Sequence, residues 1–189
     1  MSDKPWKRLE RDVAKYFGTK RRLRGNDFSQ SDVEVLATLK DWLKYPQENF
    51  GIVVECKYRQ SQPLIDLVTD TDEKANFYCK PVVLMGNYIL CCLQDFAEVF
   101  VTLTKDHLSL DDLDKLNFRK VTKKVPDYLE SYMQQATEYT TRQSSITLLP
   151  VVCLAKANSK YKVVIFSRDA LKAFNKSLHK SNETTEHSS

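Results

Sequence analysis

Glu55 and Lys57 are the residues best suited to carry chemistry. They are separated by one residue inside the apolar run GIVVECKY (51–58). Side chains two positions apart on a β-strand project to the same face, so a strand here would set the carboxylate beside the ammonium group. Strand interiors disfavour charged residues. The pair is therefore either a salt bridge on a solvated strand face or part of a catalytic site.

A second acidic position precedes this run. The segment SDVEVL (31–36) alternates, so Asp32 and Glu34 share one face of the predicted strand. Two carboxylates from neighbouring strands attract a hard divalent cation such as Mg²⁺, which takes oxygen ligands and keeps several waters. The ion can hold an attacking water and offset charge on a phosphate. Lys57 beside it can orient that water and stabilise the transition state.

A third carboxylate belongs to a predicted first helix, from about Pro5 to Phe17. Its apolar residues recur at helical spacing and cluster on one face. Proline suits the first turn of a helix, and Gly18 suits its end. Glu10 falls on the flank of the apolar face, where the helix meets the rest of the fold.

The order of these residues carries a resemblance. Glu10 is followed by Asp32 in SDVEV, and then by Glu55 and Lys57 in VVECKYR. This resembles the PD-(D/E)XK nuclease superfamily, and within it the Holliday-junction-resolvase-like and phage-type endonucleases. The resemblance covers residues 5–59 and continues through a predicted helix, 127–142, and strands at 150–166. The position before Asp32 is Ser31 rather than the superfamily's proline.

The resemblance implies a role for each matched residue. Asp32 and Glu55 would bind Mg²⁺, for which Mn²⁺ can substitute, with the main-chain carbonyl of Cys56 as a further ligand. Lys57 would be the catalytic lysine, and Glu10 would reach a second metal or a metal-bound water. The implied enzyme is a metal-dependent deoxyribonuclease that resolves branched DNA in recombination, repair or viral replication. Water would attack in line, leaving a 5′-phosphate and a 3′-hydroxyl.

The charge distribution agrees with a polyanionic partner. Residues 1–25 hold nine Lys or Arg residues against three acidic ones, whereas the other 164 residues have a net charge of −2. A basic segment just before the Asp32 strand is predicted to contact DNA phosphates independently of sequence. Its cations are Lys20, Arg21, Arg22 and Arg24. A solvated charged face is the alternative interpretation.

The remaining patterns predict an α/β fold: one domain with a central mixed β-sheet flanked by helices, a restriction-endonuclease-like core. The nuclease domain would span 1–179, with an insertion at about 60–125 and a flexible tail at 180–189. A hairpin is predicted at PVVLMGNYILCCL (81–93), turning at Gly86-Asn87. Ser167 would cap the last helix. The tyrosines of the helix 127–142, and Gln60 and Gln62 after the lysine, are interpreted as ordinary packing and polar residues.

Composition excludes several classes. The chain has 189 residues, 42% of them hydrophobic and 29% charged, which excludes wholesale disorder. No apolar stretch is long enough to span a membrane, and no secretory leader is visible. The five cysteines form no CxxC pair and the three histidines are scattered, so we expect reduced thiols in a cytoplasmic protein, or in the host cytoplasm if the source is viral. No small-molecule cofactor is expected, and a homodimer suits an enzyme that cuts symmetric strands.

Other functions remain open at this point. A catalytically inactive DNA-binding relative would keep the fold and the basic surface. Restriction or exonuclease activity would use the same residues, although no separate specificity domain is evident. An interaction protein in which the motif is a coincidence would show no salt-dependent DNA binding. The sequence does not rank DNA structures as substrates, and it leaves open whether Glu34 or Gln60 takes part.

Overall fold

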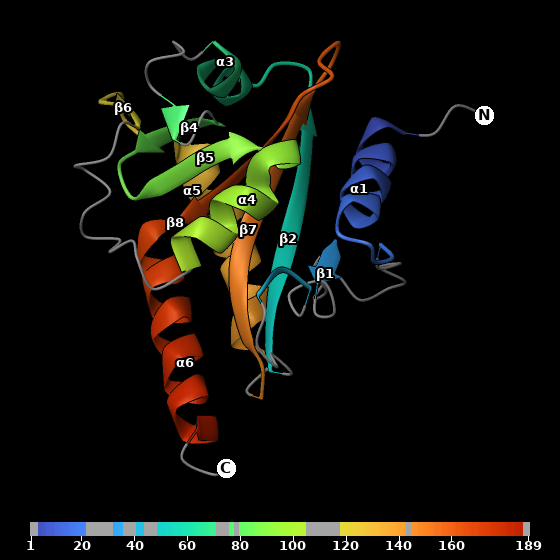
Figure 1. The fold of residues 1–189 in the computed structure, drawn as a ribbon. Helices are drawn as coiled ribbons and strands as arrows, with labels where there is room; N and C mark the ends of the chain where they lie inside the picture. The colour runs from blue at the N-terminus through green and yellow to red at the C-terminus, as the bar shows by residue number, and fades with distance from the viewer. Residues whose placement is uncertain are drawn as a thin grey trace.

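The computed structural model describes residues 4–21, 32–35, 41–43, 49–70, 76–77, 80–104, 118–142 and 145–186. Its centre is a mixed sheet, coloured along the chain in Figure 1. The strand order is β1 (Val33–Val35), β2 (Phe50–Arg59), β7 (Thr147–Lys156), β8 (Lys162–Ser167), β5 (Tyr88–Cys92), β4 (Lys80–Met85) and β3 (Asn76–Phe77), with β6 (Arg119–Val121) also paired to β4. The β2–β7 and β4–β6 pairs are parallel and the others antiparallel. The prediction of an α/β domain with a central mixed sheet is confirmed.

Helices cover both faces of this sheet. One face packs against α1 (Pro5–Tyr16), α4 (Phe96–Thr104) and α6 (Arg168–Glu186). The other packs against α3 (Pro63–Thr69) and α5 (Asp127–Thr141). In Figure 1, α4 lies in front of the sheet and α5 behind it. The central strands are therefore buried on both sides, which explains their nearly continuous apolar sequences.

The helix α1 forms where its apolar periodicity predicted. It begins with Pro5 in its first turn, and Gly18, just beyond its end, takes a positive φ of 64°. Glycine has no Cβ, so this left-handed conformation costs it little. Leu9 and Val13 are buried in the core on the α1 side of the sheet, and Phe17 joins them. This packing fixes the side of α1 that carries Glu10.

The strands β2 and β7 form the longest pairing in the sheet. They run parallel from Phe50 opposite Thr147 to Arg59 opposite Lys156. Ile52, Val54 and Cys56 join the core on the α1 side, as the alternation predicted. The intervening side chains, including those of Glu55 and Lys57, project to the α5 side. The carboxyl end of β2 thus carries the residues of chemical interest.

The predicted insertion, 60–125, contributes strands to the same sheet. The predicted hairpin is present as β4 and β5, with Met85 opposite Tyr88 across the turn. Gly86 has a φ of 57°, as a two-residue turn with glycine in its first position requires. Because β5 also pairs with β8, the described part of this region widens the sheet and does not stand apart from it.

The C-terminal helix differs from its prediction in length. Ser167 caps it as predicted: its Oγ accepts a hydrogen bond from the Ala170 amide at 3.2 Å. However, α6 continues to Glu186, so residues 180–186 of the predicted tail are helical. No glycine or proline interrupts 180–186, so the helix can propagate one hydrogen bond per residue.

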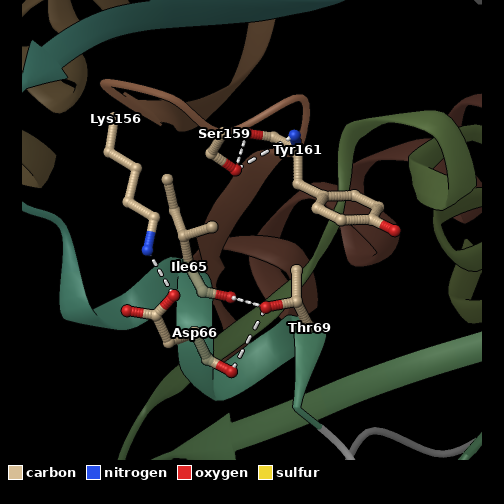
Figure 2. Close-up of polar contacts among 6 residues, drawn as sticks. All are labelled: Ile65, Asp66, Thr69, Lys156, Ser159 and Tyr161. Carbon is tan, nitrogen blue, oxygen red and sulfur yellow. Dashed lines mark hydrogen bonds and ion pairs between the residues drawn. The ribbon is translucent and has the colours of Figure 1, made fainter.

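Contacts at the far end of β7 hold α3 in place. Figure 2 shows Lys156, the last residue of β7, paired with Asp66 of α3. Thr69 Oγ1 donates to the Ile65 carbonyl at 3.0 Å, within the same helix. The turn from β7 to β8 contains Asn158, whose φ is 58°, a conformation that asparagine tolerates. The Lys156–Asp66 ion pair thus joins the end of β7 to α3, the helix that follows β2.

Within the described ranges, none of the helices has both the length and the apolar character needed to cross a membrane.

Candidate active site

Lys57 and Glu55 form the centre of the candidate site. Lys57 Nζ lies 2.6 Å from Glu55 Oε1, so the two side chains share a face of β2 as the alternation predicted. The Glu55 side chain is 1% exposed and that of Lys57 is 24% exposed. The ammonium group therefore compensates a buried carboxylate while it remains partly open to solvent. An ion pair on a fully solvated strand face does not describe this geometry.

Asp32 meets β2 at its edge. It lies just before β1, outside the strand predicted to contain it, and it is 3% exposed. Its Oδ2 accepts a hydrogen bond from the Cys56 amide at 2.7 Å. The antiparallel register pairs Val33 with Val54, so one further step would set Asp32 opposite Glu55. The two acidic residues therefore occupy neighbouring positions at one end of the β1–β2 pair.

Glu10 approaches from α1. It is 7% exposed, and its Oε2 lies 2.9 Å from Arg21 Nη1. The charge of Arg21 thus compensates a buried carboxylate, and its predicted contact with DNA phosphates stays a prediction. Lys20 is exposed beside it, whereas Arg22 and Arg24 lie outside the described residues.

The Cys56 thiol lies within electrostatic reach of all three carboxylates. Burial raises the pKa of this thiol well above its ordinary value. Charge interactions with Cys153, Asp32, Glu10 and Glu55 raise the pKa further, because each of these groups, when ionised, disfavours a second negative charge nearby. Residues from α1, from the segment before β1 and from β2 therefore act electrostatically on one point of the sheet.

Each carboxylate is nevertheless bonded to a protein group in this arrangement. Glu10 pairs with Arg21, Asp32 accepts from a backbone amide, and Glu55 pairs with Lys57. Among the described ranges, no three His, Cys, Asp or Glu side chains are grouped so that they could hold a metal ion together. A metal shared by Asp32 and Glu55 therefore remains a prediction.

Helix α5 adds contacts that the sequence interpretation missed. Lys57 Nζ donates a hydrogen bond to Gln135 Oε1 at 2.8 Å. The same ammonium group lies 5.2 Å from the centroid of the Tyr132 ring. Gln135 and Tyr132 are three residues apart, so they share a helix face. The only feature of the sequence that could have indicated this contact is a glutamine on the inward-facing side of an amphipathic helix, and that feature does not identify Lys57 as the partner.

Arg59, at the end of β2, lies against the same helix. Its guanidinium carbon is 5.2 Å from the centroid of the Tyr128 ring and 5.3 Å from that of Tyr132. Burial raises the pKa of Tyr128 and the charge of Tyr132 raises it further, while the charge of Arg59 opposes this. The interpretation of these tyrosines as ordinary core residues is therefore incomplete, because two of them hold cations of β2.

The polar residues near Asp32 and after Lys57 divide into exposed and buried positions. Glu34 is half-buried in β1, and Gln60 is exposed directly after β2. Gln62 is 1% exposed, and neither polar atom of its amide has a hydrogen-bonding partner within the described residues. Gln62 is therefore not the ordinary strand-end residue that the sequence suggested.

We expect Gln62→Leu to increase the free energy of unfolding by about 1 kcal/mol or more. A buried polar group without a partner costs about 1–3 kcal/mol, and leucine has nearly the same size without that cost. Urea denaturation of the wild type and the variant measures the difference, with the exposed Gln60→Leu as the matched control. A clear loss of stability in Gln62→Leu would show that this amide is hydrogen-bonded in solution.

Comparison of the chain with models of protein families, with curated proteins and with solved structures found no match.

Proposed function

We propose that this protein is a Mg²⁺-dependent DNA endonuclease with a restriction-endonuclease-like core, acting on branched DNA. The observation that carries the proposal is the pairing of Lys57 with the buried Glu55 beside the Asp32 carboxylate, at the end of two adjacent strands. Burying a carboxylate is costly unless the group is paired and hydrogen-bonded, so a buried acid beside a partly exposed lysine calls for a structural or chemical role. The resemblance to the PD-(D/E)XK superfamily supports the chemical interpretation.

The donor set fits a hard divalent cation. Asp32 and Glu55 supply carboxylate oxygens, which are the ligands that Mg²⁺ prefers. The N–H and C=O of one strand residue point to the same edge, so the Cys56 carbonyl faces the edge where Asp32 binds the Cys56 amide. These three groups would hold the ion, which supplies an activated water and charge compensation for phosphoryl transfer when it is bound.

Three side chains of the protein would have separate roles in cleavage. Lys57, partly exposed and held by Glu55 and Gln135, would stabilise negative charge that builds on the attacked phosphate. Gln135 would act as a positioning residue, because it restricts the rotamers of the lysine. Glu10 would reach a metal-bound water once it separates from Arg21.

A cleavage assay tests this proposal. Linear duplex, single-stranded, flapped and four-way-junction DNAs are incubated with Mg²⁺, Mn²⁺ or EDTA. We expect cleavage only with the metals, products with a 5′-phosphate and a 3′-hydroxyl, and the fastest cleavage on the branched substrates. Faster cleavage of linear DNA would support the proposed nuclease activity but contradict the proposed preference for branched DNA. No cleavage of any substrate would overturn the enzyme proposal.

One observation favours a second candidate, a catalytically inactive DNA-binding relative. All three carboxylates are bonded to protein groups, and the described residues contain no metal-holding group of three side chains. Isothermal titration with Mn²⁺ separates the two candidates. Specific binding that depends on Asp32 supports the enzyme, and its absence supports the inactive relative.

We expect the triple substitution of Lys20, Arg22 and Arg24 by alanine to weaken affinity for all DNA sequences alike. The slope of log affinity against log salt should fall by up to about one unit for each lost phosphate contact. Arg21 is retained because it pairs with Glu10. Replacement of Lys172, Lys176 and Lys180, which are exposed on α6, removes the same charge and is the control. Equal effects in the two triple variants would show that this segment makes no direct contact.

A further inference from the structure

Arg59 differs from the other arginines whose contacts the structure gives. Arg21 pairs with Glu10, and Arg119 donates to the backbone carbonyls of Leu67 and Asp70. Arg59 is exposed, and the contacts that the structure gives for its side chain are with two aromatic rings. A cation–π contact forms no hydrogen bond with a carboxylate or carbonyl oxygen, so N–H donors of the guanidinium group stay available to a ligand. The donors of Arg59 are therefore positioned but not consumed by a carboxylate within the described ranges.

The aromatic support restricts where this guanidinium can be. Tyr128 and Tyr132 lie one helical turn apart on α5, with ring centroids 5.7 Å apart, and Arg59 lies over both. An exposed arginine normally loses rotamer entropy when it binds a ligand. Packing against the two rings has already restricted the rotamers of Arg59, so less entropy is lost when a ligand accepts hydrogen bonds from this preorganised group.

The position of Arg59 relative to Lys57 indicates the ligand. They are two residues apart on β2 and share its α5 face, so their Cα atoms are about 6.6 Å apart at a rise of about 3.3 Å per residue. Both cations lie within 5.3 Å of the centroid of the Tyr132 ring. This spacing is comparable to one nucleotide step along a nucleic-acid strand. A second cation so close to Lys57 is also unfavourable by itself and becomes favourable when an anion binds.

We propose that Arg59, held on Tyr128 and Tyr132, binds the backbone phosphate next to the one that is attacked beside Lys57. This inference rests on the proposed nuclease function and adds a second phosphate subsite to it. The planar fork of arginine matches two phosphate oxygens, so the contact is bidentate. It is made equally in the bound substrate and in the transition state. Arg59 therefore sets the register of the strand and not the rate of the chemical step.

Affinity measurements with protein variants test the contact. With Ca²⁺ in place of Mg²⁺, Arg59→Ala should weaken DNA binding about 10- to 100-fold, the loss typical of one charge-assisted hydrogen-bonded contact. Arg59→Lys should lose less, because it keeps the charge without the fork. Tyr128→Leu should weaken binding more than Tyr128→Phe, which keeps the ring. Arg142→Ala, exposed at the opposite end of α5, is the matched control and should bind as the wild type does.

A neutral linkage in the DNA locates the phosphate. Methylphosphonates are placed one at a time along the strand, and the affinities of the wild type and Arg59→Ala are compared. At one linkage the wild type should lose affinity while Arg59→Ala loses nearly none, because the partner of that phosphate is already absent. If cleavage maps the reacting bond, this linkage should be its immediate neighbour. If each methylphosphonate weakens the binding of Arg59→Ala by the same factor as it weakens the binding of the wild type, at every linkage, the proposal is wrong.

The failure of this inference is distinguishable from failure of the proposed function. If the wild type binds DNA but never cleaves it, the proposed nuclease activity is wrong. The methylphosphonate comparison still tests whether Arg59 binds a phosphate. If the wild type cleaves DNA and Arg59→Ala binds DNA as tightly as the wild type does, only the proposed phosphate subsite is wrong. A wild type that binds no DNA at low salt overturns both.

Discussion

Replacement of Lys57 by alanine is expected to slow single-turnover DNA cleavage by about 100- to 1000-fold while DNA affinity stays nearly unchanged. Loss of one preorganised electrostatic group typically has an effect of this size. Lys57 would act mainly in the transition state, where charge builds on the phosphate. An interaction made only there lowers turnover without raising the apparent dissociation constant. Cleavage with Mg²⁺ and gel-shift affinity with Ca²⁺, on one branched DNA, measure the two effects separately.

The structure requires a folding control for this variant. Lys57 compensates Glu55, which is almost completely buried, and removing one member of such a pair leaves an uncompensated charge. Lys57→Gln loses the positive charge but keeps a hydrogen-bond donor for Glu55, so its melting temperature should stay closer to that of the wild type. Lys176→Ala, exposed on α6, controls for loss of a surface charge. If Lys57→Gln is folded and cleaves at the wild-type rate, the catalytic role of Lys57 is wrong.

Replacement of Asp32 by asparagine should have a comparably large effect, through the metal. We expect cleavage to fall by at least about 100-fold, because the ion loses a carboxylate ligand. The fold should persist, since the asparagine oxygen can still accept the hydrogen bond from the Cys56 amide. DNA affinity without metal should stay equal or increase, because a negative charge near the phosphate path is removed.

Metal titration by thermal unfolding gives this second prediction a readout apart from activity. A ligand that binds only the folded state raises its stability as the ligand concentration rises above its dissociation constant. Mn²⁺ should therefore raise the melting temperature of the wild type and of Asp169→Asn, an exposed acidic control on α6. Asp32→Asn should show little of this increase. An equal increase in all three proteins would place the metal elsewhere or show nonspecific binding.

Loss of DNA binding together with cleavage would change the interpretation of both variants. If Lys57→Gln and Asp32→Asn are folded but no longer bind DNA, these residues serve docking and the proposed mechanism is wrong. Retained binding with lost cleavage is the outcome that separates chemistry from binding. Because Arg59 is proposed to act in binding, its alanine variant should show the opposite pattern once DNA is saturating, with turnover largely preserved.

Local pattern was enough to predict the elements that carry the candidate site. The 3.6-residue periodicity of α1 and the alternation of β2 are properties of short segments, and both elements begin and end within a residue of the expected bounds. The same alternation placed Glu55 and Lys57 on one face, where they form an ion pair. Ser167 identified the start of α6, because a capping residue acts only on its own helix. The end of α6 was not predicted, since no local stop signal marks it.

Partners that depend on contacts between distant segments were decided only by the tertiary structure. Gln135 and Lys57 are 78 residues apart, and only the packing of α5 on the β2–β7 pair brings them together. The sequence determined which residues carry charge and which face of β2 they share. Packing decided that Arg21 compensates Glu10, that Asp32 turns to the Cys56 amide, and that Arg59 rests on two tyrosines. Periodicity reports the face that a residue takes, whereas a partner depends on which other element covers that face.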